Sequence, residues 1–276
     1  MKLKTYFLVL LASFLFTYGL NFITRIIEFN GNYWSVPLLF LGLTIFFLVL
    51  FKIIEKKSWR EYGIKKITTH DFKLSFVFLF LLFPIAFIGR LFDPGFDLWY
   101  AKQSGLLTFS GLFFMFLLMP FYVFKEEIFE RSLIQSKLSQ HYSKVLLAIL
   151  ISLNFSLVHF YVTKEMSHIV STVISVFFGS LVLIFLYEAT KNVFATMICH
   201  LVYNCLIVFQ IYLHARNLFL AENIFWILYG ILFFLTVYTA VKEITNVKSV
   251  KMQLRWDDYV FFLVFVSLPL LLYFFL

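Results

Sequence analysis

Long apolar segments occupy most of this chain and constrain its fold more than any other feature of the sequence. About nine stretches approach the ~20 residues that an α-helix needs to cross the core of a bilayer. Hydrophobic residues make up 62% of the 276 residues and charged residues only 14%, with 40 phenylalanines. This composition leaves too little polar surface to cover a water-soluble globule. We therefore predict an all-α, polytopic membrane bundle of about 8–9 transmembrane helices.

The hydropathy pattern places the predicted spans near 4–22, 33–54, 73–91, 106–128, 144–161, 168–187, 193–212, 223–241 and 258–276. Lys2 and Lys4 precede the first span, but no convincing small-x-small cleavage site follows it, so we interpret it as a retained helix. Cys199 and Cys205 lie six residues apart on one predicted helix. They point to different faces of it, which argues against a disulfide and against a metal-thiolate site.

The distribution of basic residues predicts the orientation. With a cytoplasmic N-terminus, 18 of the 23 Lys and Arg residues fall on the inner side, seven of them between Lys52 and Lys73. This asymmetry follows the positive-inside rule and accounts for the net charge of +8. The C-terminus would then lie outside. The basic residues do not form one long tract, which argues against binding to nucleic acid. We expect a multi-pass protein of the cell (plasma) membrane in contact with the lipid bilayer.

Polar motifs occur at three places beside or within the apolar segments, where ionisable groups are costly and suggest function. The motifs are Glu126-Glu127 followed by Arg131, then Phe155 followed by His159, then His200 followed by Asn204.

Helical spacing indicates which of these side chains share a face. Glu127 and Arg131 are four residues apart and can pair, whereas Glu126 is turned by about 100° and can face another partner. Glu126 and His159 flank a turn-like stretch at 139–143, so an antiparallel hairpin would bring them to the same level, ~24 Å from the turn. His200 reaches this level if the polar tip from 130 to 144 projects beyond the membrane.

Together these groups predict hydrolytic chemistry. A carboxylate and an imidazole can activate a water molecule, and a second imidazole with an amide can stabilise the oxyanion that forms when water attacks a peptide bond.

The three motifs resemble those of the CPBP family, the intramembrane CAAX prenyl endopeptidases and bacteriocin-processing or Abi proteins. The segment from Phe177 to Gly179 resembles the Gly-containing helix of that family, and Tyr187 to Thr190 its Tyr-x-x-Thr ending. The loop from Trp59 to Ile64 resembles the one that often precedes the core in bacterial members. The similarity covers 106–210, which we expect to form the catalytic core, between N-terminal helices with a basic loop (1–105) and C-terminal helices (211–276).

The resemblance implies an intramembrane protease acting on membrane-anchored peptides or proteins. Glu126 would be the catalytic carboxylate, His159 its partner on the attacking water, and His200 with Asn204 the oxyanion-binding pair. Glu127 and Arg131 would support the site. We favour water activation without a cofactor, as in a glutamate protease; in the alternative, Glu126, His159 and His200 would bind zinc.

Other interpretations stay open at this stage. Single intramembrane polar residues often serve helix packing, which is our interpretation of Asn154. We expect His70, His141, His168 and His214 to be solvated, and residues 93–97 to form an outer turn. A transporter with a Glu/His proton relay is an alternative function, although no internal duplication is evident. A non-catalytic membrane immunity or scaffold protein is another.

Overall fold

The computed structural model describes residues 35–86, 93, 95–139, 143–157, 159 and 166–246, and every regular element within them is helical. In chain order these are α2 (Ser35–Glu55), the 3₁₀-helix η1 (Trp59–Tyr62), α3 (Thr69–Leu81), α5 (Phe96–Ser104), α6 (Phe109–Glu127), the π-helix η2 (Ile128–Gln135), α7 (Ser136–Leu138), α8 (Lys144–Leu157), α9 (Met166–Thr190), α10 (Val193–Ala215) and α11 (Phe219–Asn246). The predicted all-α class is confirmed for this part of the chain.

Four segments are long and apolar enough to cross a membrane. They are Thr69–Ala86, His168–Thr190, Val193–Ala215 and Phe219–Tyr238. The pair formed by α5 with α6 and η2, bent by 85°, would make a fifth if it counts as one broken span. The described residues thus account for up to five of the predicted 8–9 spans. The predicted spans at 4–22 and 258–276 lie outside these residues.

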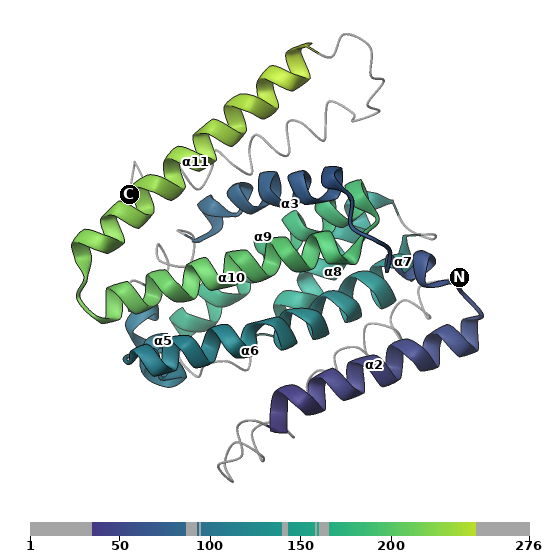
Figure 1. The fold of residues 1–276 in the computed structure, drawn as a ribbon, viewed down its shortest axis with the longest axis horizontal. Coiled ribbons are helices and arrows are strands. Elements are labelled where there is room, and N and C mark those ends of the chain that lie inside the picture. The colour runs from purple at the N-terminus through teal and green to yellow at the C-terminus, as the bar shows by residue number, and fades with distance from the viewer. Residues whose placement is uncertain are drawn as a thin grey trace.

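Helix α10 runs through the middle of the bundle, with α3 and α11 on one side and α6 and α2 on the other (Figure 1). It contacts α3, α5, α6, α9 and α11, while α8 packs on α9. Large apolar side chains are exposed on the outer faces of several helices, including Phe109, Phe113 and Leu220. Such broadly apolar outer surfaces suit contact with lipid, and the chain is an integral membrane protein.

The basic loop after α2 is folded against the start of α10. The Ser58 hydroxyl and the Glu61 carboxylate form a capping box around η1, and Gly63 ends that helix in the left-handed conformation. The Gly63 carbonyl accepts a hydrogen bond from the Val193 N–H at 2.9 Å, and the Lys65 ammonium donates one to the Thr190 carbonyl at 2.8 Å. The loop therefore fixes the α9–α10 turn in addition to carrying positive charge.

One local prediction was correct in part and a second was wrong. Residues 93–97 were expected to form a turn. The Phe96 N–H donates to the Asp93 carbonyl at 3.2 Å, as in a turn, but Asp97 already belongs to helix α5, which begins at Phe96 after Gly95 and ends at left-handed Gly105. The segment 130–144 was expected to project as a polar tip. Instead Glu130, Arg131 and Gln135 are buried, because η2 continues the α6 helix and packs against α8 and α9.

The burial of α6 and η2 also lowers the number of basic residues that can be used to predict the membrane orientation. Lys125 and Arg131 were counted with the inner-side basic residues, but both are buried inside the bundle. They do not report on membrane orientation. The folded loop from 56 to 68 keeps its cluster of basic residues, so the larger part of the asymmetry remains.

Candidate active site

The last turn of α6 and the following π-helix carry a buried ion pair. The Arg131 Nε donates to Glu127 Oε2 at 3.2 Å, as the four-residue spacing predicts, and both side chains are inaccessible to solvent. Arg131 Nη2 also donates to the Ser180 hydroxyl of α9 at 3.2 Å. Arg131 thereby links the α6–η2 segment to α9, and a π-helix at this point is typical of functional sites.

His200 of α10 joins both glutamates. Its Nδ1 lies 2.7 Å from Glu127 Oε1, and its Nε2 lies 3.8 Å from Glu126 Oε2. An ionised carboxylate only accepts hydrogen bonds, so Nδ1 carries the hydrogen and donates it to Glu127. Glu127 thus orients the imidazole, and Nε2 is the atom that His200 presents toward Glu126.

His159 lies just after α8, and its Nδ1 is 2.7 Å from the Phe155 carbonyl. Because a carbonyl oxygen only accepts, Nδ1 is the protonated nitrogen, and Nε2 of the neutral ring is left as an acceptor. The Phe155 ring contacts both imidazoles, with centroid distances of 4.8 Å to His159 and 6.4 Å to His200. Glu126 also interacts electrostatically with His159. The structure therefore brings the three predicted motifs together.

The two adjacent glutamates differ in access to solvent. The Glu126 side chain is 18% exposed, whereas that of Glu127 is fully buried. Glu126 is thus the carboxylate that a water molecule can reach. Asn204 is half-buried, one helical turn beyond His200 on α10, so it lies on the same face of that helix.

The site is surrounded by further polar residues, which the motif spacing did not identify. Lys125 Nζ lies 3.9 Å from Glu126 Oε1, and the buried Thr196 hydroxyl, one turn before His200, donates to the Val193 carbonyl at 2.8 Å. Asn154 donates to Glu130 Oε1 at 3.5 Å, consistent with the predicted packing role. Asn154 and Glu130 were visible as polar residues in or beside apolar helices. Ser180 and Thr196 are small hydroxyl residues that nothing in the sequence distinguishes from ordinary helix-packing residues.

The region from α6 to the middle of α10 therefore carries a buried, connected set of carboxylates and imidazoles. Residues 107–206 match the family model of the Type II CAAX prenyl endopeptidase Rce1-like proteins. This confirms, over that segment, the family predicted from the motifs. The Rce1-like family is one of endopeptidases, so the match indicates a hydrolase of the protease class. No curated protein and no solved structure matches the chain.

The predicted environment of the remaining histidines was correct in part. His70 is exposed at the start of α3, as expected. His168 is instead buried in α9 and contacts Asp93, and His214 is half-buried near the end of α10 beside Glu222. The prediction for His168 was wrong because its acidic partner lies 75 positions away in the sequence. The prediction for His214 was correct in part, since its side chain remains 37% exposed. His141 lies outside the described residues.

Proposed function

We propose that this chain is an intramembrane endopeptidase in which Glu126 activates water for attack on a peptide bond. The observation that carries the proposal is the division of roles between neighbouring carboxylates. Glu127 is engaged by both Arg131 and His200, whereas Glu126 retains solvent access beside the two imidazoles. The Rce1-like match over 107–206 supports the same reaction class.

In the proposed reaction, a water molecule donates one hydrogen bond to Glu126 and the other to His159 Nε2. Glu126 removes the first proton as the water oxygen forms a bond to the peptide carbonyl carbon. The protonated Glu126 then gives this proton to the departing amine as the C–N bond breaks. One water is consumed, and the products are an amine and a carboxylic acid that keeps the second proton of the water until it ionises.

The oxyanion formed on the carbonyl oxygen would be stabilised by His200 and Asn204. This role requires a hydrogen on His200 Nε2 in addition to the one that Nδ1 donates to Glu127, and therefore an imidazolium. The amide nitrogen of Asn204 would supply the second donor. Arg131 and Glu127 would hold the imidazole in place rather than contact the substrate.

The substrate class follows from the site's setting among apolar helices. The site suits the peptide of a membrane-anchored substrate, and a prenylated CAAX tail is one candidate by analogy with the Rce1-like family. Leader peptides and other membrane-bound peptides are the alternatives. We propose further that the N-terminus is cytoplasmic and that the site opens from that side of the plasma membrane.

The test is cleavage of membrane-anchored reporter peptides, with and without a prenyl group, by the purified full chain in detergent. Glu126→Gln and His159→Ala should each lower kcat/KM by at least ~10²-fold, the usual contribution of a general base. Glu61→Gln, an exposed glutamate that caps η1, is the matched control and should keep full activity. Cleavage that survives both site substitutions would refute the assignment.

Treatment with a strong chelator distinguishes metal-free activation of water by Glu126 from zinc-dependent hydrolysis. Activity unaffected by the chelator would support direct activation of water by Glu126. Activity lost with the chelator and restored by zinc would instead make Glu126, His159 and His200 the metal ligands, with zinc lowering the pKa of the attacking water.

A further inference from the structure

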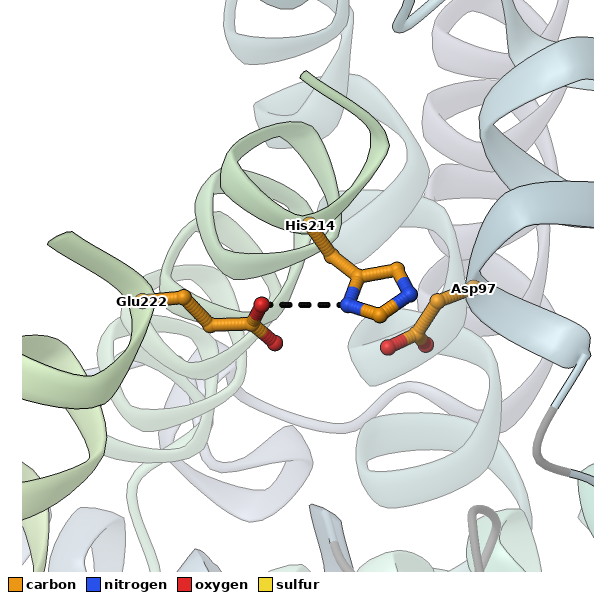
Figure 2. A group of neighbouring side chains, drawn as sticks. All are labelled: Asp97, His214 and Glu222. Carbon is orange, nitrogen blue, oxygen red and sulfur yellow. Dashed lines mark hydrogen bonds and ion pairs between the residues drawn. The ribbon is translucent and has the colours of Figure 1, made fainter. Parts of the chain in front are cut away.

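A second polar cluster lies near the end of α10 that is remote from His200. It consists of Asp97 of α5, His214 of α10 and Glu222 of α11 (Figure 2), and one ligand atom of each lies within 4.8 Å of the others. Asp97 and Glu222 are buried. At 1.5 Å per residue, His214 lies about 21 Å along the helix from His200, so this cluster is separate from the candidate active site.

The ligand atoms of the three side chains lie close to one another. Figure 2 shows the His214 imidazole between the two carboxylates, and its Nδ1 is 3.0 Å from Glu222 Oε2. The backbone around the cluster is tightly connected. The Asn217 N–H donates to the His214 carbonyl at 3.0 Å, and the Glu222 N–H donates to the Leu218 carbonyl at 3.0 Å. The short α10–α11 connection therefore fixes the positions from which His214 and Glu222 extend.

Gln210 orients both carboxylates from behind. Its Nε2 donates to Glu222 Oε1 at 2.6 Å and to Asp97 Oδ2 at 3.4 Å, and the side chain is buried one turn before His214. Groups that hold the ligands in this way are the usual second layer of a metal site, because they set the direction of each ligand's free lone pairs. One amide thus restrains the two acidic ligands together.

The charges of the three groups favour a divalent cation. Two carboxylates carry two negative charges, and one imidazole contributes at most one positive charge. A divalent ion beside a neutral imidazole would balance both carboxylates. One imidazole nitrogen with two carboxylate oxygens is a ligand set that suits zinc and similar transition ions better than calcium or magnesium, which prefer oxygen alone.

We propose that Asp97, His214 and Glu222 bind one divalent transition-metal ion of the zinc type, which ties α5, α10 and α11 together. Zinc ligands lie ~2.0–2.2 Å from the ion and so about 3.3–3.6 Å from one another in a tetrahedral site. The three ligand atoms, now within 4.8 Å of one another, therefore need to approach by at most about 1.5 Å. Water would complete a four-coordinate site. The ion would have a structural role, independent of peptide hydrolysis.

The test is zinc binding by the chelator-stripped full chain in detergent, read by elemental analysis and by the midpoint of thermal unfolding. A background carrying Glu126→Ala and His159→Ala removes any zinc held at the candidate active site. In this background we expect one zinc per chain and a rise of several degrees in Tm on adding zinc. His214→Ala should abolish both effects, and the exposed His70→Ala should leave both unchanged.

Glu222→Gln guards against the possibility that His214→Ala fails to fold, because it keeps the side-chain shape and removes one charge. It should weaken zinc binding at least tenfold while leaving the unfolding midpoint in chelator close to that of the parent. The proposal is overturned if the background chain binds no zinc, or if His214→Ala and Glu222→Gln bind it as the parent does. It is also overturned if these variants lower Tm equally with and without zinc, which would indicate a polar bridge alone.

Discussion

At the scale of single residues, Arg131 is the side chain on which the candidate site most depends for its structure. It is completely enclosed, donates to Glu127 and Ser180, and lies 6.0 Å from the centre of the Phe155 ring. A buried charge is tolerated only when it is paired and hydrogen-bonded, so each of these contacts offsets part of the cost of removing the guanidinium from water.

Arg131→Ala should therefore destabilise the protein by about 3–5 kcal/mol, because it removes the guanidinium from the buried Glu127 carboxylate and leaves His200 as its remaining ion-pair partner. The measurement is the free energy of unfolding in mixed detergent. Lys191→Ala is the matched control, since Lys191 is 52% exposed and pairs with Glu188 at 2.7 Å. Although the Glu188 side chain is only 10% exposed, the Lys191 ammonium is solvated, and we expect such a surface pair to contribute about 0–1 kcal/mol. Equal losses of unfolding free energy in the two variants would show that the buried Arg131–Glu127 pair stabilises the protein no more than the Lys191–Glu188 pair does.

The sequence predicted the Glu127–Arg131 pair because both residues belong to one helix, where a spacing of four fixes the contact. It also distinguished Glu126 from Glu127 by their angle around the helix. It could not predict that Glu127 would be shared between Arg131 and His200. His200 lies 73 positions away, and that contact depends on how α10 packs against α6.

At the scale of elements, the turn at Gly63 connects the basic loop to the start of α10. Gly63 has φ +72°, and a Cβ atom at this position would lie 2.6 Å from the Tyr187 hydroxyl oxygen. Gly105 has nearly the same backbone conformation, φ +73°, but its Cβ would meet nothing within 4 Å. Alanine substitutions at these two glycines therefore distinguish the cost of a left-handed backbone from the cost of steric overlap with a neighbouring side chain.

Both Gly63→Ala and Gly105→Ala should lose roughly 1–2 kcal/mol of stability from the left-handed backbone. Gly63→Ala should lose more, because Tyr187 is buried and has to shift. It should also reduce peptidase activity, since the turn holds Val193 at the start of the helix that carries His200. Paired thermal unfolding and cleavage assays test this, and indistinguishable variants would argue against the packing of Gly63 on Tyr187.

Helices α2, α8, α9 and α10 begin and end within about four residues of the predicted spans, because an apolar run of bilayer length permits few other structures. The spans predicted at 73–91 and 106–128 match less well, since α3 covers Thr69–Leu81 and α6 continues into η2. The short elements α5, η1 and η2 were not predicted. A nine-residue helix such as α5 has no sustained hydropathy pattern, and the π-helix differs from an α-helix only in its hydrogen bonds. The Asp97–His214–Glu222 cluster was missed for a related reason, since its members come from three elements whose packing the sequence does not reveal.

At the scale of the whole molecule, α10 sets the distance between two polar ends. Its 23 residues span about 34 Å, slightly more than the ~30 Å hydrocarbon core. Gly63 of the basic loop is hydrogen-bonded to Val193, the first residue of α10. Asp97 of α5 is hydrogen-bonded to Gln210, near the last turn of α10. The loop and α5 therefore lie at opposite ends of α10, and we expect them on opposite faces of the membrane.

Arg60→Cys and Lys102→Cys should accordingly react with a membrane-impermeant maleimide from opposite sides. Both positions are exposed, one in the basic loop and one on α5. In sealed vesicles of known orientation, we expect Arg60→Cys to be labelled from the cytoplasmic side and Lys102→Cys from the outer side. The parent chain, with only Cys199 and Cys205, gives the background. Labelling of both positions from one side would contradict the arrangement.

The enclosed charges at the end of α6 also constrain the order in which the protein can be assembled. Lys125, Glu126, Glu127, Glu130 and Arg131 fall within seven consecutive positions, and a charged residue at mid-bilayer depth costs about 2.5–3.5 kcal/mol during insertion. Their partners Ser180 and His200 are synthesised later. The α6–η2 segment is therefore poorly suited to enter lipid alone, and its stable insertion depends on the arrival of α9 and α10.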